Sequence, residues 1–80
     1  MGSIHQFYDK SPLGGYVIAN KDIKGNLNYE GFVRQDGAWY VMRETVSQGD
    51  HTYEYVQGFG DYETSWAGRA DLNYKPFHHT

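Results

Sequence analysis

Residues 29–57, YEGFVRQDGAWYVMRETVSQGDHTYEYVQ, decide the fold of this chain. Three runs rich in aromatic and β-branched residues alternate here with two polar breaks, a pattern typical of antiparallel strands joined by tight turns. The first break holds Asp36-Gly37, a pair that favours a tight hairpin because such turns require positive φ angles. The second break is Ser47-Gln48-Gly49-Asp50. The stretch therefore predicts a meander of strands over Tyr29–Gln35, Ala38–Val46 and Thr52–Gln57.

Two weaker β signals flank this centre. Residues Gly14–Ala19 (GGYVIA) form a short β-rich run, and Ala70–Tyr74 (ADLNY) alternates before Pro76 and predicts a final strand. The fold class that we expect is mainly β: a small antiparallel meander, arranged as a curled sheet or as a small barrel or sandwich, with one short helix near residues 61–68. Several glycines lie in or beside the β-runs, and we interpret them as bends or bulges: Gly15, Gly31 and Gly58.

The helical signal follows the meander. Asp61 is placed to cap a short helix over Tyr62–Ala67, and Gly68 is placed to end it in the left-handed conformation. A helix of this length is marginal on its own, so aromatic side chains must anchor it to the sheet. We therefore expect Trp66 to be largely buried against the strands.

Strand alternation assigns side chains to faces, because successive residues of a strand point to opposite sides. Trp39 and Val41 share one face, and the other face of that strand carries Tyr40, Met42, Glu44 and Val46. In the next strand Tyr53 and Tyr55 lie together, opposite Glu54 and Val56. Neither face is purely polar, so we expect the sheet to be covered on both sides over part of its length.

Length, charge and cysteine content limit the function classes. Eighty residues form one domain, 1–80, in which we interpret residues 1–12 and 76–80 as extended arms. The absence of cysteine excludes disulfides, thiolate nucleophiles and cysteine-based metal sites. A net charge of −3 with scattered cations argues against nucleic acid as a partner. No membrane-spanning run or signal peptide is evident, so we expect a soluble, unprocessed protein without membrane contact.

No residue pattern indicates catalysis, a metal or a cofactor. The four histidines, His5, His51, His78 and His79, lack the spacing that directs two rings at one ion, and His78 and His79 point apart on an extended chain. Glu44 and Glu54 could form a carboxylate pair across the second turn, but solvent-facing residues paired with arginines are the simpler interpretation. We therefore expect a protein that is not an enzyme and has no catalytic, cofactor-binding or metal-binding residues.

Tyrosine is the unusual feature of the composition. Eight tyrosines in 80 residues exceed what one small core needs, and tyrosine suits half-buried contact surfaces. The rings could fill a thin core, form a protein-binding surface or stack on sugars. The candidate interface residues come from two strand positions and from the arms: Ile4, Phe7, Tyr8, Tyr53, Tyr55 and Phe77.

Residues 31–74 resemble small uncharacterised β proteins encoded by tailed bacteriophages. The resemblance rests on a pattern of aromatic residues and glycines: Gly31-Phe32-Val33-Arg34, Asp36-Gly37-x-Trp39-Tyr40-Val41-Met42-Arg43-Glu44, Tyr53-x-Tyr55-Val56-x-Gly58, and Asp61-Tyr62-x-x-x-Trp66-x-x-Arg69-Ala70-x-Leu72-x-Tyr74. It implies a structural or virion-associated setting, in a virion or the host cytoplasm. It implies no activity and no catalytic residue.

These observations lead to one function hypothesis and two alternatives. We expect a non-enzymatic structural or adaptor component that acts through protein–protein contacts, by self-association or by binding other structural proteins. The first alternative is a carbohydrate-binding module that uses tyrosines together with Trp39 or Trp66. The second is a small inhibitor of a host protein.

Overall fold

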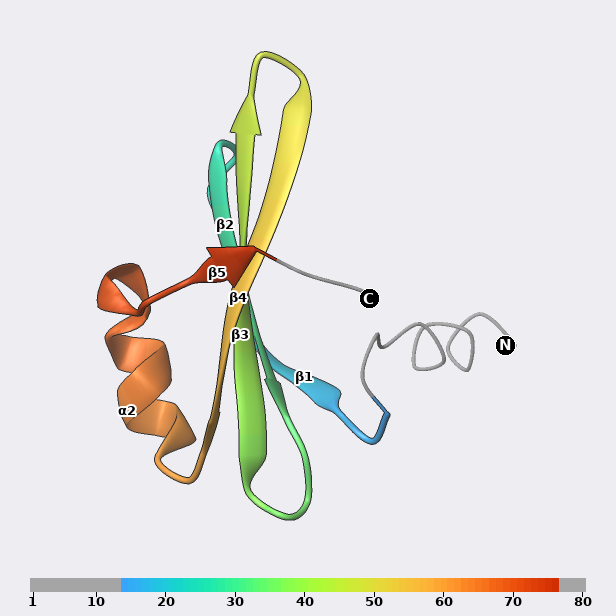
Figure 1. Cartoon of the computed structure of the whole chain (residues 1–80), viewed down its shortest axis with the longest axis vertical. Coiled ribbons are helices and arrows are strands. Elements are labelled where there is room, and N and C mark those ends of the chain that lie inside the picture. Colours follow the sequence, from blue (N-terminus) through green and yellow to red (C-terminus); the bar gives the residue numbers. More distant parts are fainter. Residues whose placement is uncertain (1–13, 77–80) are drawn as a thin grey trace.

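Five antiparallel strands form one sheet in sequence order (Figure 1). The structure is a computed structural model, and it describes residues 14–76. The strands are β1 (Val17–Ile23), β2 (Leu27–Val33), β3 (Ala38–Ser47), β4 (Asp50–Phe59) and β5 (Lys75–Pro76). Helix α2 (Tyr62–Ala67) and a 3-10 turn (Arg69–Asp71) lie between β4 and β5. The mainly β meander is confirmed, and over the described residues it is an unclosed sheet, not a barrel or sandwich.

Strand β3 is the centre of the sheet. It pairs along its whole length with β4 and along most of it with β2, so that Val41 lies opposite both Gly31 and Val56. The three central strands that the sequence predicts are confirmed, with small differences at their ends. The face assignments are confirmed as well, because this register places Trp39 and Val41 on the side of α2 and Tyr40 and Met42 on the other.

The two central turns explain this register. At the first, the Gly37 N–H donates to the Arg34 carbonyl (3.0 Å) and the Arg34 N–H to the Ala38 carbonyl (2.9 Å). Gly37 has a φ of 96°, which completes the predicted hairpin. At the second, Gln48 and Gly49 both have positive φ angles, 54° and 84°, as a two-residue turn of type I′ requires.

The first strand differs from its prediction. β1 begins at Val17 and continues through the polar residues to Ile23, whereas the sequence run ended at Ala19. Pairing with β2 supplies hydrogen-bond partners that local composition does not reveal, and the register shifts between Ile18 and Asn20. The irregularity therefore lies in β1, not at the glycines of β2 and β4.

The final strand predicted over Ala70–Tyr74 is wrong. The chain there begins with the 3-10 turn Arg69–Asp71, in which the Asp71 N–H donates to the Gly68 carbonyl (2.9 Å). Strand pairing starts only at Lys75, opposite Tyr55 of β4. Alternation over five residues does not distinguish a strand from a short turn whose apolar side chains point toward the same core.

Helix α2 covers the predicted residues Tyr62–Ala67, but both of its predicted caps are wrong. Asp61 has a left-handed φ of 56° and makes no side-chain cap hydrogen bond. The chain reverses here after β4, with Gly60 also at positive φ, so the Asp61 backbone is not in the extended conformation of an N-cap. Gly68 has a φ of −97°, because the chain continues directly into the 3-10 turn.

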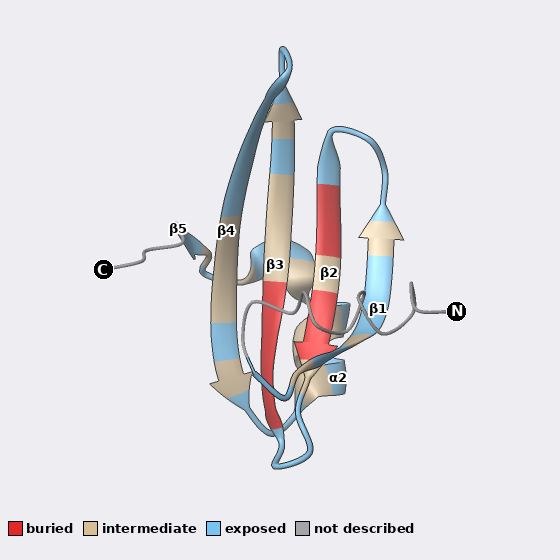
Figure 2. Ribbon diagram, turned by 90° about the vertical axis from the view of Figure 1, so that its right-hand side faces the viewer, coloured by how far each residue is buried: buried red, intermediate tan, exposed pale blue. Residues whose placement is uncertain are grey.

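The core lies between the sheet and α2 (Figure 2). We call this side of the sheet the helix face. Its buried centre is Tyr29, Trp39 and Val41. Six partly buried side chains pack around it: Val33, Val56, Tyr62, Trp66, Leu72 and Tyr74. Trp66 thus anchors the helix as predicted, although it is half-buried instead of largely buried.

Glycines in β2 and β4 allow this aromatic packing. A Cβ atom on Gly31 would collide with the Tyr62 hydroxyl and lie 3.0 Å from Trp66 Cε3. A Cβ atom on Gly58 would collide with the Trp39 ring, 2.6 Å from its Cε2. These two glycines therefore mark close approach of aromatic rings, and the interpretation as bends or bulges is wrong. Gly15 lies in the turn before β1, with a φ of 81°.

Arg69 closes one side of the helix face. The Arg69 guanidinium lies 2.7 Å from Asp22 Oδ2 of β1 and 4.4 Å from the centroid of the Trp66 ring. The Tyr74 hydroxyl donates to the Arg69 carbonyl (2.9 Å), and burial raises the pKa of Tyr74 to about 12. These contacts tie the segment after α2 to the edge strand β1. No helix in residues 14–76 has the length and apolar character needed to cross a membrane.

Candidate functional site

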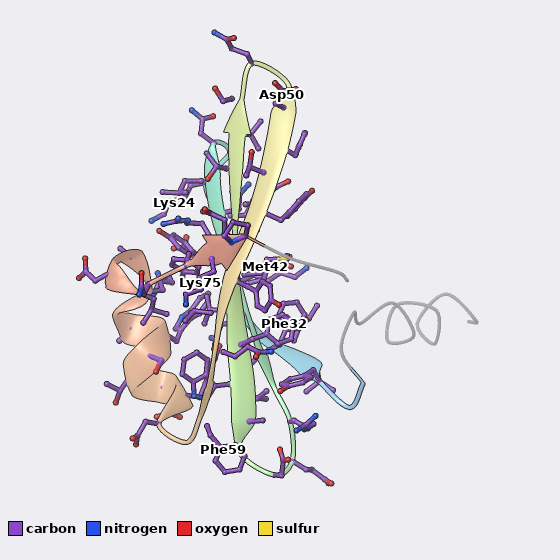
Figure 3. All side chains as sticks on the ribbon, viewed as in Figure 1. Lys24, Phe32, Met42, Asp50, Phe59 and Lys75 are labelled. Atoms are coloured by element: carbon purple, nitrogen blue, oxygen red, sulfur yellow. The ribbon has the colours of Figure 1, made fainter. Side chains whose placement is uncertain are left out.

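The side of the sheet opposite α2, which we call the distal face, carries a row of aromatic rings. Phe32 and Tyr40 are stacked, with centroids 4.4 Å apart, and Tyr16 meets Tyr40 edge-on at 5.0 Å. Tyr55 continues the row from β4, 6.2 Å from Tyr40. Figure 3 shows the labelled Phe32 and Met42 on the side of the sheet away from α2. The row runs from the start of β1 across to β4.

Exposure increases from the centre of the row toward β4. Tyr40 and Phe32 are buried, Tyr55 is half-buried, and Tyr53 keeps 47% of its surface exposed. Tyr53 and Tyr55, both predicted as interface residues, lie on the same face of β4, opposite Glu44 and Met42 of β3. The remaining predicted interface residues, Ile4, Phe7, Tyr8 and Phe77, lie outside the described residues.

A polar cluster lies beside Tyr53, and we call it the Glu44 cluster (Asn28, Glu44, His51 and Tyr53). Glu44 Oε2 accepts a hydrogen bond from the Tyr53 hydroxyl (3.0 Å) and lies 2.7 Å from His51 Nδ1. Glu44 Oε1 accepts a bond from Asn28 Nδ2 (2.9 Å). The carboxylate therefore joins β2, β3 and β4 at one end of the sheet.

Asn28 fixes the cluster to the turn between β1 and β2. Its side chain is buried, and its Oδ1 accepts bonds from the backbone N–H groups of Lys24 (2.7 Å) and Gly25 (3.0 Å). Its amide nitrogen donates both to the Gly25 carbonyl and to Glu44. The Glu44 carboxylate is thus held in one position, whereas the His51 side chain is 51% exposed.

Hydrogen bonding shifts the pKa values of two groups in this cluster, Glu44 and Tyr53. The bonds from His51, Asn28 and Tyr53 lower the pKa of the Glu44 carboxyl group below its ordinary value. The bond to this carboxylate raises the pKa of the Tyr53 hydroxyl group. At neutral pH the distal face therefore presents a fixed carboxylate, a neutral phenol and an imidazole oriented through its Nδ1 atom.

The carboxylate pair that the sequence allowed is not formed. Glu44 faces the distal side, whereas Glu54 is opposite Arg43 on the helix face and accepts a bond from its Nε (3.2 Å). This pairing of Glu54 with Arg43 agrees with the simpler interpretation of the sequence, in which the glutamates pair with arginines. Glu44 is paired with Tyr53 and Glu54 with Arg43, so the two glutamates are one residue out of register and point to opposite faces.

Sequence reasoning missed the contact between Glu44 and His51. The sequence predicts a strand that begins only at Thr52, but the turn consists of Gln48 and Gly49 alone, so His51 already lies in β4 opposite Val46. A two-residue turn assigned from the Gln-Gly pair would have placed His51 diagonally opposite Glu44. The other histidines, His5, His78 and His79, are outside the described residues.

Two further observations concern the tryptophans and the grouping of possible metal ligands. Trp39 and Trp66 pack on the helix face, and Trp39 Nε1 donates to the Gly60 carbonyl (2.7 Å). Within residues 14–76, no three His, Asp or Glu side chains are grouped so as to hold a metal ion.

Comparison of the chain with protein-family models, curated proteins and solved structures finds no significant match.

Proposed function

We propose that this protein is a non-enzymatic structural or adaptor component, and that the distal face of its sheet is the surface that contacts other proteins. The resemblance to phage-encoded proteins makes a virion-associated component our preferred setting, in the particle or in the host cytoplasm. Self-association or binding of another structural protein would use the same surface.

The observation that carries this proposal is the exposed aromatic end of the distal face. Tyr53 is 47% exposed and lies beside the half-buried Tyr55, next to a polar cluster in which hydrogen bonds lower the pKa of Glu44. Rigid aromatic rings with polar groups at their edges are enriched at protein interfaces, because they bury large areas at little cost in side-chain entropy. The helix face, in contrast, is occupied by α2.

Light scattering of the full chain tests this proposal. We expect association that increases with concentration, or a stable complex with a structural partner, and we expect Tyr53→Ser combined with Tyr55→Ser to abolish it. Leu27→Ser is the matched control, because Leu27 is an apolar side chain of similar exposure (41%) on the helix-face side of β2. A double variant that associates as wild type does, or an equal loss in the control, would contradict the proposal.

Carbohydrate binding is the second candidate, supported by the Glu44 cluster. Carboxylate, amide and imidazole groups next to an exposed phenol ring can hydrogen-bond and stack on a sugar. The two tryptophans are packed on the helix face, so such a site would depend on Tyr53 and Tyr55. Binding of a monomer to a glycan array, lost in Tyr53→Ser, would favour it. A stoichiometric complex with one host enzyme would instead favour the inhibitor alternative.

A further inference from the structure

The Glu44 cluster presents only hydrogen-bond acceptors to solvent. The ionised carboxylate of Glu44, which Asn28 holds in one position, has no hydrogen to donate, so both neighbours of its Oε2 atom must act as donors. The Tyr53 hydroxyl gives its single hydrogen to this oxygen (3.0 Å), which leaves lone pairs alone on the phenol oxygen. The Nδ1 atom of His51, 2.7 Å from the same oxygen, must likewise carry a hydrogen, and Nε2 of the neutral ring is then an acceptor.

The negative charge of Glu44 has no lysine or arginine beside it. Among residues 14–76, its only ion-pair contact is His51. Lys21 and Lys75, the lysines on the distal face, lie in the row of Tyr55, which is the next row of the register. A group that covers the cluster must therefore supply donors and positive charge, because it would otherwise leave a desolvated carboxylate and unpaired acceptors.

We propose that the Glu44 cluster and the exposed Tyr53 ring bind an arginine side chain of another protein. This inference rests on the proposed function, because it names the group that the contact surface of the distal face recognises. A guanidinium group has five N–H donors, no acceptor and a permanent charge, so it matches acceptors arranged around a carboxylate. Its plane also stacks on aromatic rings, whereas a lysine ammonium is a compact, strongly hydrated charge.

The arginines of this chain are already engaged, which favours a different protein over a second copy. Each of them pairs with a carboxylate: Arg34 with Asp36, Arg43 with Glu54, and Arg69 with Asp22. A second copy would have to break one of these ion pairs to supply a guanidinium group. A partner with an unpaired arginine would not.

NMR titration of the isotopically labelled full chain with Nα-acetyl-arginine amide tests this inference. We expect saturable shifts of the Tyr53 ring and His51 ring resonances. Nα-acetyl-citrulline amide, which keeps the shape of arginine without its charge, should bind about tenfold more weakly, because hydrogen bonds to charged groups are the stronger ones. Nα-acetyl-lysine amide should also bind more weakly than the arginine amide, because it does not stack as a plane on the ring.

Two substitutions locate the site. Glu44→Gln removes the charge and replaces one acceptor with a donor, so it should weaken arginine binding by about tenfold. Tyr53→Ser removes the ring and should weaken it by about threefold or more. Glu63→Gln is the matched control, because it removes an exposed carboxylate from α2, on the other side of the sheet, and it should bind arginine as wild type does. The comparison of arginine with citrulline uses the wild-type chain, so it decides the question even where a variant does not fold.

Several outcomes would overturn the inference: no saturable shift of Tyr53 or His51, equal binding of the arginine and citrulline amides, or equal losses in Glu44→Gln and Glu63→Gln. Lysine amide that binds as tightly as arginine amide would refute the choice of arginine. The proposed function is measured separately, by association without any added amide. Association that the tyrosine double variant abolishes, with no response to arginine, would refute this inference alone. A response to arginine in a chain that forms no complex would contradict the proposed function alone.

Discussion

Replacement of Gly31 by alanine tests how α2 is attached to the sheet. Gly31 is buried, and a Cβ atom there would collide with the Tyr62 hydroxyl, lie 2.9 Å from Tyr62 Cζ and lie 3.0 Å from Trp66 Cε3. The Tyr62 ring cannot move aside freely, because its hydroxyl donates to Asn20 Oδ1 (2.8 Å) and its ring stacks with Trp66. The added methyl group must therefore displace both rings, and α2 with them.

The expected cost follows from overpacking. Forcing an extra methyl group into a packed site destabilises by about 1–3 kcal/mol, and two linked rings favour the upper half of that range. Alanine in place of glycine also removes unfolded-state entropy, which offsets about 0.4–1 kcal/mol. We therefore expect a net loss of about 1–2.5 kcal/mol in the free energy of unfolding, measured by urea denaturation with tryptophan fluorescence.

Two variants make this experiment decisive. Gly14→Ala is the control, because nothing lies within 4 Å of a Cβ atom at Gly14, and it should be neutral or slightly stabilising. Tyr62→Phe removes the hydroxyl that collides with the new methyl group. Alone it should destabilise by about 0.5–1.5 kcal/mol through loss of the bond to Asn20, but in the Gly31→Ala background it should cost less or restore stability. A Gly31→Ala protein as stable as Gly14→Ala, or additive effects in the double variant, would refute the packing argument.

Three further predictions concern the hairpin, the helix and the polar cluster. Gly37→Val should destabilise by about 1 kcal/mol or more in urea, because Gly37 has a φ of 96°, whereas Gln35→Val in the same turn should not. Trp66→Ala should cost about 3 kcal/mol or more, since Trp66 packs on the core, and the exposed Thr64→Ala on the same helix should leave the urea midpoint nearly unchanged. Glu44 has a lower pKa in the folded protein than in the unfolded chain. Its stabilising contribution is therefore fully present above the unfolded-state pKa and is lost as the pH falls through the folded-state pKa. The urea midpoint should therefore fall on acidification below about pH 4.5, with a smaller fall in Glu44→Gln. An equal dependence of the urea midpoint on pH in the wild type and in Glu44→Gln would disprove this last prediction.

Local sequence signals were sufficient for the central strands. Glycine at the turn before β3, alternation in β3 and β4, and the break at Gln48-Gly49 fix three strands, their order and their faces. The helix was also predicted, although its caps were not, because the positive φ of Asp61 depends on how the chain leaves β4. Such conformations result from tertiary contacts and not from the residue type alone.

The remaining elements depend on pairing and packing over long distances in the sequence. β1 extends through polar residues because β2 supplies its partners, and β5 is only two residues long. From the sequence alone, Gly31 indicates a break or bulge in the strand. Its actual role, to make room for the rings of Tyr62 and Trp66, depends on contacts with a helix far along the chain. The Glu44 cluster likewise joins residues on three strands, so its prediction requires the register of both hairpins.

The two faces of the sheet can be altered separately, and this separation makes the proposed function testable. Tyr53 and Tyr55 alternate along β4 with Glu54 and Val56, which contact Arg43 and the core on the helix face. Substitution of the two tyrosines therefore leaves the packing of α2 unchanged, whereas Gly31→Ala disturbs α2 and leaves the distal face in place. If association depends on the distal face, it should persist in a folded Gly31→Ala protein and disappear in a tyrosine double variant of normal stability. If association instead results from partial unfolding, it should change with the free energy of unfolding in both the Gly31→Ala protein and the tyrosine double variant.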